Sequence, residues 1–217
     1  MYKRQYRDRF RKPHPVVPNT TKVPASPLPP DDPRVVYVGH LTRPRGVHEL
    51  IELGRMLHER TDGRLRVQLV GHADGEATEA LEAASAWVDW LGFLPHEEAM
   101  AVVDGALAGV SLLHDEPNYR VSQPTKVIEY LAHGVPVVTT PLPLARRLVE
   151  DVGAGVVVPF GDVSAAAEAV LALEGVPDVR ARMGLLGHAH AREQLDWTLR
   201  SREFVSRMGA IAGAPRV

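Results

Sequence analysis

Short apolar runs alternate with longer amphipathic stretches along most of this chain, and the alternation predicts strands and helices in turn. The apolar runs are nearly continuous, which is typical of strands buried on both faces of a parallel sheet. We predict six strands, at Val35–Gly39, Leu65–Gly71, Val88–Phe93, Gly109–His114, Val135–Thr140 and Gly155–Phe160. Between them the pattern predicts helices over Val47–Arg60, Gly75–Ala86, Glu97–Ala106, Thr125–His133 and Leu144–Val152. The predicted fold class is therefore α/β, a doubly wound parallel Rossmann-like sheet of about six strands.

The two ends of the chain differ from this alternation. Residues 1–33 hold many prolines and little that could form a core, and we expect them to be a linker. Residues 34–175 form the predicted Rossmann-like domain, whose last helix is capped at Asp162 or Ser164. Residues 176–217 are predicted to be helical. The two helices expected there are Pro177–Glu193 and Leu195–Met208.

The first residues, MYKRQ, match the translation of a transposon end that is used to fragment sequencing libraries. We therefore expect the reading frame to be truncated at this point. A natural basic tail is the alternative.

Composition removes several classes of protein. The 217 residues can bury a sizeable core, and the formal net charge of -2 gives no general case for nucleic-acid binding. The chain has no cysteine, which excludes disulfides and thiolate metal sites. No apolar stretch is long enough to cross a bilayer, and no apolar segment follows the basic N-terminal residues as it would in a secretory signal. We expect a cytoplasmic protein.

The most informative motif is PTKVIEYLAHGVPVVTT, residues 124–140, which predicts a short helix that ends at Gly134 and leads into a buried strand. At about 100° per residue, Lys126, Glu129 and His133 fall on one side of this helix. The opposite side is apolar and consists of Val127, Ile128, Leu131 and Ala132. We expect the apolar side to pack on the sheet and the charged side to face a cleft.

The start of this helix has the features of an anion site. Pro124 has no N–H to lose there, so the free amides from Thr125 onward can bind an anion with help from the helix dipole. A nucleotide sugar fits such a place, because its phosphates suit the amides and Lys126 while its hydroxyls suit Glu129. The alternative is an ordinary surface pair of Lys126 and Glu129, worth about 0.2 to 0.5 kcal/mol.

A second candidate element is the strand, basic loop and helix around Gly39, which is typical of a phosphate-binding turn. The basic residues of the loop are His40, Arg43 and Arg45, and the helix begins near Gly46. Arg45 offers a planar fork that matches phosphate oxygens, whereas His40 titrates near neutral pH. Arg43 either shares this role or points into water. A plain strand-to-helix turn would also require a glycine at position 39, so Gly39 does not distinguish such a turn from a phosphate-binding one.

Strand topology brings the two elements together. Ligands of doubly wound sheets bind outside the carboxyl ends of the strands, so His40, Arg45, Lys126 and Glu129 are expected to face one crevice. The loops after the second and third strands are expected to wall a nucleoside base. For Phe93, at the end of the third strand, we favour packing in the core.

These motifs resemble the donor-binding motifs of the GT-B fold glycosyltransferases, in the large retaining family that includes many polysaccharide and lipopolysaccharide assembly enzymes. PTKVIEY fits a variant with Pro, a polar residue, Lys, two apolar residues, Glu and Tyr. By this resemblance Glu129 holds the donor's ribose, and His40 and Arg45 bind its diphosphate. The family usually has another Glu eight positions before the one that matches Glu129, and this other Glu contacts the transferred sugar. Val121 stands there in this chain, so the sugar is left unidentified.

The resemblance implies that this chain is the C-terminal, donor-binding half of a GT-B hexosyltransferase. It also implies that residues 1–33 are the interdomain linker and the remnant of a missing N-terminal acceptor domain. Such an enzyme transfers a sugar from a nucleoside diphosphate sugar to an acceptor hydroxyl in glycan or glycolipid assembly. Arg45 and Lys126 would act in catalysis by offsetting the charge on the departing diphosphate. The acceptor, a glycan or lipid-linked sugar, would meet the missing N-terminal domain, and the full enzyme could associate peripherally with a membrane. The fragment alone is expected to bind nucleotide without turnover.

No metal site and no cofactor is predicted. His188 and His190 are the tightest histidine pair, but two residues apart on a helix their rings point to different sides. The family resembled is generally metal independent. Two other functions stay open: a GT-B nucleotide-sugar epimerase, and a non-catalytic Rossmann-like binding module.

Overall fold

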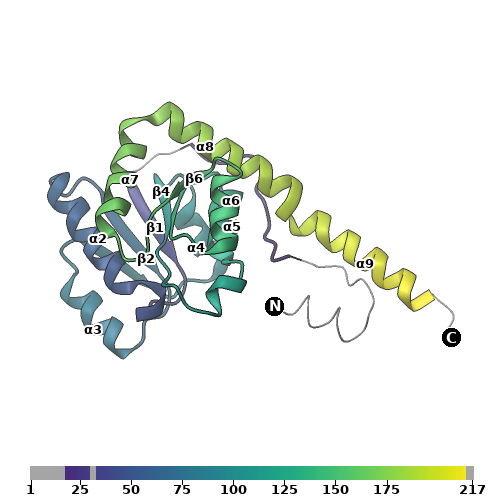
Figure 1. Cartoon of the computed structure of the whole chain (residues 1–217), viewed down its shortest axis with the longest axis horizontal. Helices are drawn as coiled ribbons and strands as arrows, with labels where there is room; N and C mark the ends of the chain where they lie inside the picture. Colours follow the sequence, from purple (N-terminus) through teal and green to yellow (C-terminus); the bar gives the residue numbers. More distant parts are fainter. Residues whose placement is uncertain (1–17, 30–32, 214–217) are drawn as a thin grey trace.

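The computed structural model describes residues 18–29 and 33–213 of the chain. At its centre lies a six-stranded sheet whose neighbouring strands are all parallel, with helices on both faces (Figure 1). The strands are β1 (Arg34–Val38), β2 (Arg66–Val70), β3 (Val88–Gly92), β4 (Ala108–Ser111), β5 (Val137–Thr139) and β6 (Gly155–Val157). Their order is β3-β2-β1-β4-β5-β6, so the direction of winding reverses between β1 and β4. The predicted fold class is confirmed.

Two layers of helices sandwich the sheet. One face is covered by α2 (Val47–Arg60), α3 (Gly75–Ala83) and α7 (Val163–Gly175). The other face is covered by α4 (His96–Val103), α5 (Thr125–Ala132) and α6 (Pro143–Glu150). The chain ends with α8 (Pro177–His190), a π-helical turn (Ala191–Leu195) and α9 (Trp197–Gly213). In Figure 1, α9 extends away from the rest of the domain.

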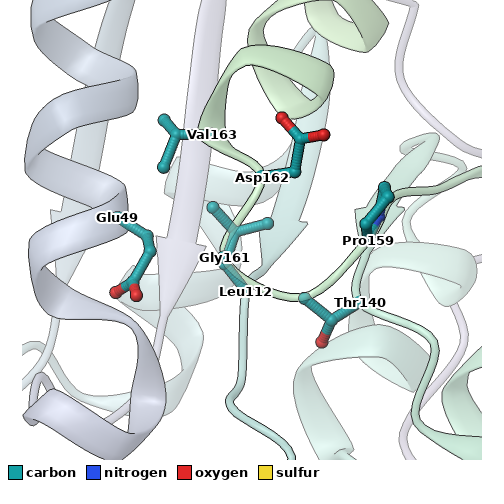
Figure 2. Close-up of a pocket in the computed structure, with 7 residues that line it drawn as sticks. All are labelled: Glu49, Leu112, Thr140, Pro159, Gly161, Asp162 and Val163. Atoms are coloured by element: carbon teal, nitrogen blue, oxygen red, sulfur yellow. The ribbon is translucent and has the colours of Figure 1, made fainter.

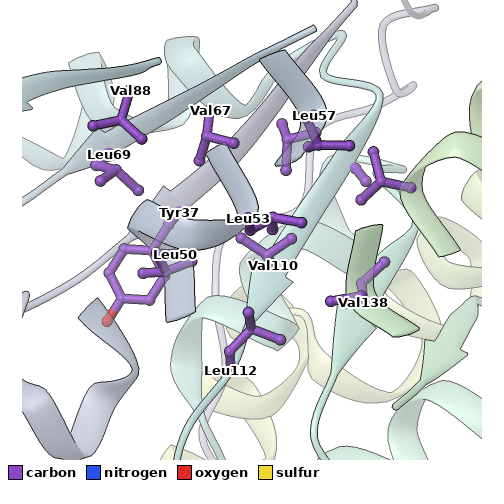
Figure 3. Packing of buried hydrophobic residues seen from close by; sticks show 14 of the residues in the cluster. Tyr37, Leu50, Leu53, Leu57, Val67, Leu69, Val88, Val110, Leu112 and Val138 are labelled. Carbon is purple, nitrogen blue, oxygen red and sulfur yellow. The ribbon is translucent and has the colours of Figure 1, made fainter. Parts of the chain in front are cut away.

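Alternate residues of β1 enter different cores. Val35 and Tyr37 belong to the cluster beneath α2 and α7, whereas Val36 belongs to the cluster beneath α4, α5 and α6. Figure 3 shows the Tyr37 ring beside Leu50 of α2 in the first cluster. A strand buried on both faces needs apolar residues at every position, which accounts for the continuous apolar runs in the sequence.

The strands end earlier than their apolar runs. β4 ends at Ser111 and not at His114, although Leu112 and Leu113 are still buried. β6 likewise ends at Val157 instead of Phe160. Apolar residues continue beyond the last paired position because they cover the sheet edge, so hydrophobicity alone overstates strand length.

The limits of the helices agree with the prediction better than the limits of the strands do. The Asp162 side chain accepts a hydrogen bond from the Ala165 N–H at 2.8 Å, so Asp162 and not Ser164 caps α7. α3 stops at Ala83, where the next residues form a turn into β3. The expected end of α8 at Glu193 falls within the π-helical turn.

The described part of the predicted linker pairs with the start of α9. The Thr21 N–H donates to the Leu195 carbonyl at 3.1 Å, and the Trp197 N–H donates to the Thr21 carbonyl at 2.9 Å. Trp197 is about half exposed. The predicted remnant of another domain falls on residues 1–17, outside the described residues. In the part of the chain that is described, no helix has the length and apolar character needed to cross a membrane.

Candidate functional site

Three glycines form the carboxyl edge of the sheet at β1, β2 and β3. Gly39, Gly71 and Gly92 have φ angles of 138°, 141° and 69° and end or follow these strands. The Gly39 N–H donates to the Val70 carbonyl at 2.8 Å, and the Gly71 N–H donates to the Gly92 carbonyl at 2.7 Å. A Cβ on Gly71 would lie 2.0 Å from the Gly39 oxygen, so only glycine fits there. The edge therefore exposes backbone where a ligand can approach closely.

An aromatic residue follows each of these glycines, and the three rings lie in series along the edge. The centroids of His40 and His72 are 6.0 Å apart, and those of His72 and Phe93 are 4.7 Å apart with nearly parallel planes at 11°. Phe93 is 61% exposed, so the prediction that it packs in the core is wrong. Its strand ends one residue earlier, at a glycine with positive φ, and the ring therefore leaves the sheet.

The loops after β1 and β4 lie against each other, as the reversal of strand order requires. The loop after β1 contains a 3₁₀ turn, η1 (Arg43–Arg45), and ends at Gly46, whose φ is 84°. A Cβ on Gly46 would lie 2.3 Å from the Leu112 carbonyl oxygen after β4. The His114 N–H donates to the Pro44 carbonyl at 3.0 Å. This contact ties the basic loop to the segment that leads into α5.

Lys126, in the first turn of α5, is buried at the centre of this region, with 5% of the residue exposed. Its Nζ lies 3.7 Å from the centroid of the Tyr37 ring and 3.2 Å from the position of a Cβ on Gly39. Among the described residues, Nζ has no hydrogen-bond partner. The side chain thus crosses the end of β1, where glycine leaves room, and reaches a ring that belongs to the opposite core.

The charged side of α5 does not face one cleft as predicted. Lys126 is covered by Tyr37, whereas His133, at the other end of the helix, is largely covered by Asp104 but lines a pocket beside α4; its Nδ1 lies 2.7 Å from Asp104 Oδ1. These covering residues come from distant parts of the chain. Only Glu129 keeps an appreciable exposure on this side, with 17% of its side chain accessible.

Arg45 and Glu129 both act on the buried amine. Burial lowers the pKa of Lys126 well below its ordinary value, the Arg45 charge lowers it further, and the Glu129 carboxylate opposes this. Burial raises the pKa of Glu129 itself, against the charges of His96, Lys126 and His133. His96 Nδ1 lies 3.9 Å from Glu129 Oε1. The guanidinium of Arg45 and the carboxylate of Glu129 therefore lie near the same amine and not on opposite surfaces.

Tyr37 is a site residue that the sequence analysis missed. Its hydroxyl donates to the His40 carbonyl at 2.7 Å, and its ring supports Lys126. Burial raises the pKa of Tyr37, and the neighbouring Arg45 charge opposes the increase. In the sequence this residue is one more apolar-strand position, so nothing local distinguishes it.

Two further predicted residues occupy the start of α5. Pro124 is the N-cap residue, without a side-chain cap, and Thr125 is the first helical residue. Arg45 lies on the neighbouring turn, with its Cζ 6.0 Å from the centroid of the Tyr119 ring. The amides that follow Pro124 thus belong to the first turn of α5, and Arg45 lies beside the turn that precedes this helix.

Position 121, between β4 and α5, holds no carboxylate. Val121 is 52% exposed on the turn η2 (Tyr119–Val121). Asp115, which is near in sequence, pairs with Arg120 at 2.6 Å. Arg43 is exposed on η1.

Two pockets flank this region. Figure 2 shows the smaller one, at the carboxyl ends of β4 to β6, with Glu49 on one side and Thr140 and Pro159 on the other. Glu49 Oε1 lies 2.8 Å from His114 Nε2, while its other oxygen is buried without a partner. The larger pocket, about 310 Å³, lies between α4 and residues 22–24. Within the described residues, no three His, Asp or Glu side chains are grouped so that they could hold a metal ion.

A family model for glycosyl transferases group 1 matches residues 32–174. A sequence search of curated proteins gave no match. Among solved structures, the sucrose-phosphate synthase of Thermosynechococcus elongatus superposes with a TM-score of 0.76 and 21% identity, over 98% of this chain and 57% of that one. The C-terminal domain of LpcC, a glycosyl transferase group 1 family protein of Francisella tularensis, gives a TM-score of 0.64 and 14% identity, over 90% and 93%.

Two other similar structures are of proteins bound to a nucleotide. HepE of Anabaena, in complex with UDP, gives a TM-score of 0.69 and 17% identity, over 82% of this chain and 49% of that one. TarM of S. aureus, in a complex that includes UDP, gives 0.69 and 14%, over 87% and 37%. At these identities the likeness is one of fold. The chain spans 37% to 57% of the length of the TarM, HepE and sucrose-phosphate synthase chains.

Proposed function

Since this chain belongs to the glycosyl transferases group 1 family, we propose that it is the donor-binding part of a glycosyltransferase. The donor is a nucleoside diphosphate sugar, and the acceptor is a hydroxyl of a glycan or lipid-linked sugar. Because the chain spans only part of the length of whole relatives, acceptor recognition is assigned to a domain beyond it. The similar HepE and TarM proteins were solved with UDP, which supports a nucleotide ligand for this chain.

The observation that carries this proposal is a pair of basic side chains at the point where the strand order reverses. Among the described residues, Lys126 has no hydrogen-bond partner and no carboxylate forms an ion pair with Arg45. Basic groups in this state, beside the first amides of a helix, suit an anion. A diphosphate placed there lies outside the carboxyl ends of β1 and β4, where doubly wound sheets bind ligands.

In the transfer step the bond between the sugar's anomeric carbon and the diphosphate oxygen breaks, and its electron pair leaves with the diphosphate. The acceptor oxygen forms the new bond to that carbon and loses its proton to a group outside this chain. Arg45, Lys126 and the amides after Pro124 offset the charge that develops on the diphosphate. Glu129 accepts hydrogen bonds from the ribose hydroxyls, and His40 adds a donor beside the phosphates.

The base is assigned to the edge formed by β2 and β3. Phe93 is exposed and stacks on His72 at the ends of these strands, so a base that continues the series has an aromatic face to stack on. Stacking of a base on an aromatic side chain is worth about 1 to 3 kcal/mol.

Titration of the chain with UDP, GDP and ADP, measured by calorimetry, tests the proposal. We expect selective micromolar binding of one nucleotide, lost in Glu129→Ala and weakened at least about tenfold in Arg45→Gln. The exposed Arg43→Gln variant is the matched control and should bind within about threefold of the unmodified chain. Failure of all three nucleotides to bind would favour the non-catalytic binding module. For the epimerase alternative the comparisons give no support.

A further inference from the structure

We propose that the donor site takes up a proton when the diphosphate binds, and that Lys126 is the group that takes it up. In the empty site its amine rests uncharged on the face of Tyr37, and it becomes an ammonium only when phosphate oxygens arrive. This inference rests on the proposed function, because it concerns the same site.

The resting position of the amine does not suit an ammonium. An ammonium has three N–H donors, and none of them has an acceptor at the Lys126 Nζ. The nearest groups are the Tyr37 ring, 3.7 Å to its centroid, and the backbone of Gly39. Burial removes water as an alternative partner, since only 5% of the residue is exposed.

The neighbouring groups, taken element by element, do not restore the charge. Strand β1 supplies Tyr37, which is neutral, and the loop after β1 supplies Arg45, whose positive charge repels another. Helix α5 supplies Glu129, the single carboxylate that acts on Lys126 among the described residues, and its effect is smaller than those of burial and Arg45. Tyr130, also on α5, is hydrogen-bonded to β1 and is neutral. His40, which follows Gly39 on the loop, is not among the groups that shift the pKa of Lys126.

Attraction to the aromatic ring is too weak to reverse this balance. A cation over an aromatic face gains less, even when it is desolvated, than it costs to remove an ion from water into a relaxed protein interior. The pKa of Lys126 accordingly lies well below its ordinary value, with burial as the main cause. The empty site therefore holds a neutral amine and one charged guanidinium.

A bound diphosphate changes the balance in the same place. It brings negative charge and several acceptor oxygens, which satisfy the donors of an ammonium. The flexible four-carbon stem of Lys126 can turn Nζ from the ring toward the phosphates, because Gly39 has no Cβ on that path. A proton from solvent completes the ion pair, so one proton enters for each diphosphate bound.

Proton uptake is measurable by calorimetry of the 217-residue chain in buffers that differ in ionisation enthalpy. The probe is whichever of UDP, GDP and ADP binds, at pH 8.5, where a terminal phosphate with a second pKa near 6 is already fully ionised. We expect an uptake that approaches about one proton per nucleotide, and an affinity that falls up to about tenfold per pH unit above this pH.

The variants separate Lys126 from the other titratable groups of the site. Lys126→Met should bind more weakly, with no uptake and with an affinity that is nearly independent of pH in this range. His40→Asn and Glu129→Gln also weaken binding, but each should still take up the proton. The chemical shift of the Lys126 ¹³Cε in the unmodified chain gives an independent measurement, since it reports whether the amine is neutral before nucleotide is added and charged afterward.

The outcomes distinguish this inference from the proposed function. Binding by the unmodified chain without uptake, or equal uptake by Lys126→Met, would refute the inference and leave the donor site intact. Absence of binding to all three nucleotides would refute the proposed function and the inference with it. A ¹³Cε shift typical of an ammonium in the empty site would also refute the inference.

Discussion

Replacing Lys126 by methionine should stabilise the protein while it weakens nucleotide binding. The amine is buried without a hydrogen-bond partner, and a buried polar group in that state costs about 1 to 3 kcal/mol. Methionine has a similar length and no donor, so it fills the same space between α5 and the Tyr37 ring without this cost. This gain applies to the neutral amine, and below pH 10.5 the cost of keeping the amine neutral adds to it. We therefore expect the free energy of unfolding to rise by more than about 1 to 3 kcal/mol at pH 7.5.

The pH dependence gives the prediction a sign that a packing effect would not share. The pKa of Lys126 is lowered in the folded protein, so at a pH between the folded value and the ordinary value of 10.5 the unfolded chain binds one more proton. Stability then rises with pH, by about 1.4 kcal/mol per unit for one proton. Lys126→Met lacks this contribution, and its advantage should shrink as the pH approaches 10.5.

Urea unfolding at pH 7.5, 8.5 and 9.5, followed by circular dichroism, measures both effects. The matched control is Lys22→Met, because Lys22 is exposed and its loss should change stability by no more than about 0.5 kcal/mol at any pH. A Lys126→Met variant that is less stable than the unmodified chain would refute the reasoning. So would a stability difference from the unmodified chain that does not change with pH.

Three further predictions follow from the site. Gly71→Ala should lower the free energy of unfolding by at least about 1 to 3 kcal/mol in urea unfolding, because its Cβ would lie 2.0 Å from the Gly39 oxygen at a φ of 141°. The control Gly75→Ala, with open space around its Cβ, should be nearly neutral. Phe93→Ala should weaken nucleotide binding by about tenfold or more in calorimetry with little change in stability, since the ring is 61% exposed. Glu129→Gln should remove a pH-dependent contribution to the free energy of unfolding. The raised pKa of the Glu129 carboxyl favours folding below its ordinary value of 4.5, and this benefit is lost as the pH rises through the folded pKa. In urea unfolding the variant should therefore gain stability, relative to the unmodified chain, as the pH approaches neutrality.

The parts of this molecule that could be predicted from sequence are those that depend on local patterns. Short apolar runs predicted all six strands, and several of these runs are nearly continuous because a strand buried on both faces has no polar side. The strand, glycine and basic loop around Gly39 located one side of the site, and Pro124 located the start of α5. Each of these signals lies within a few residues of the feature that it predicts.

The parts that could not be predicted depend on residues distant in sequence. Helical periodicity placed Lys126 and His133 on an open charged side, yet Tyr37 and Asp104 cover them after the chain folds. Tyr37 itself carries no local signal, since its role comes from a helix that begins almost ninety positions later. Phe93 was misjudged because an apolar run does not show where the last paired residue lies.

A pattern that joins the local and the distant features is the repetition of glycine followed by an aromatic ring at the ends of β1, β2 and β3. Along the sequence these pairs are about twenty to thirty residues apart and look unrelated. The strand order β3-β2-β1 places them side by side, so that the glycines bring the backbones close and the rings form one series. The edge thus combines exposed backbone near β1 with an exposed aromatic surface near β3. In the proposed site the phosphates use the first and the base uses the second, beside the strand reversal where Arg45 and Lys126 lie.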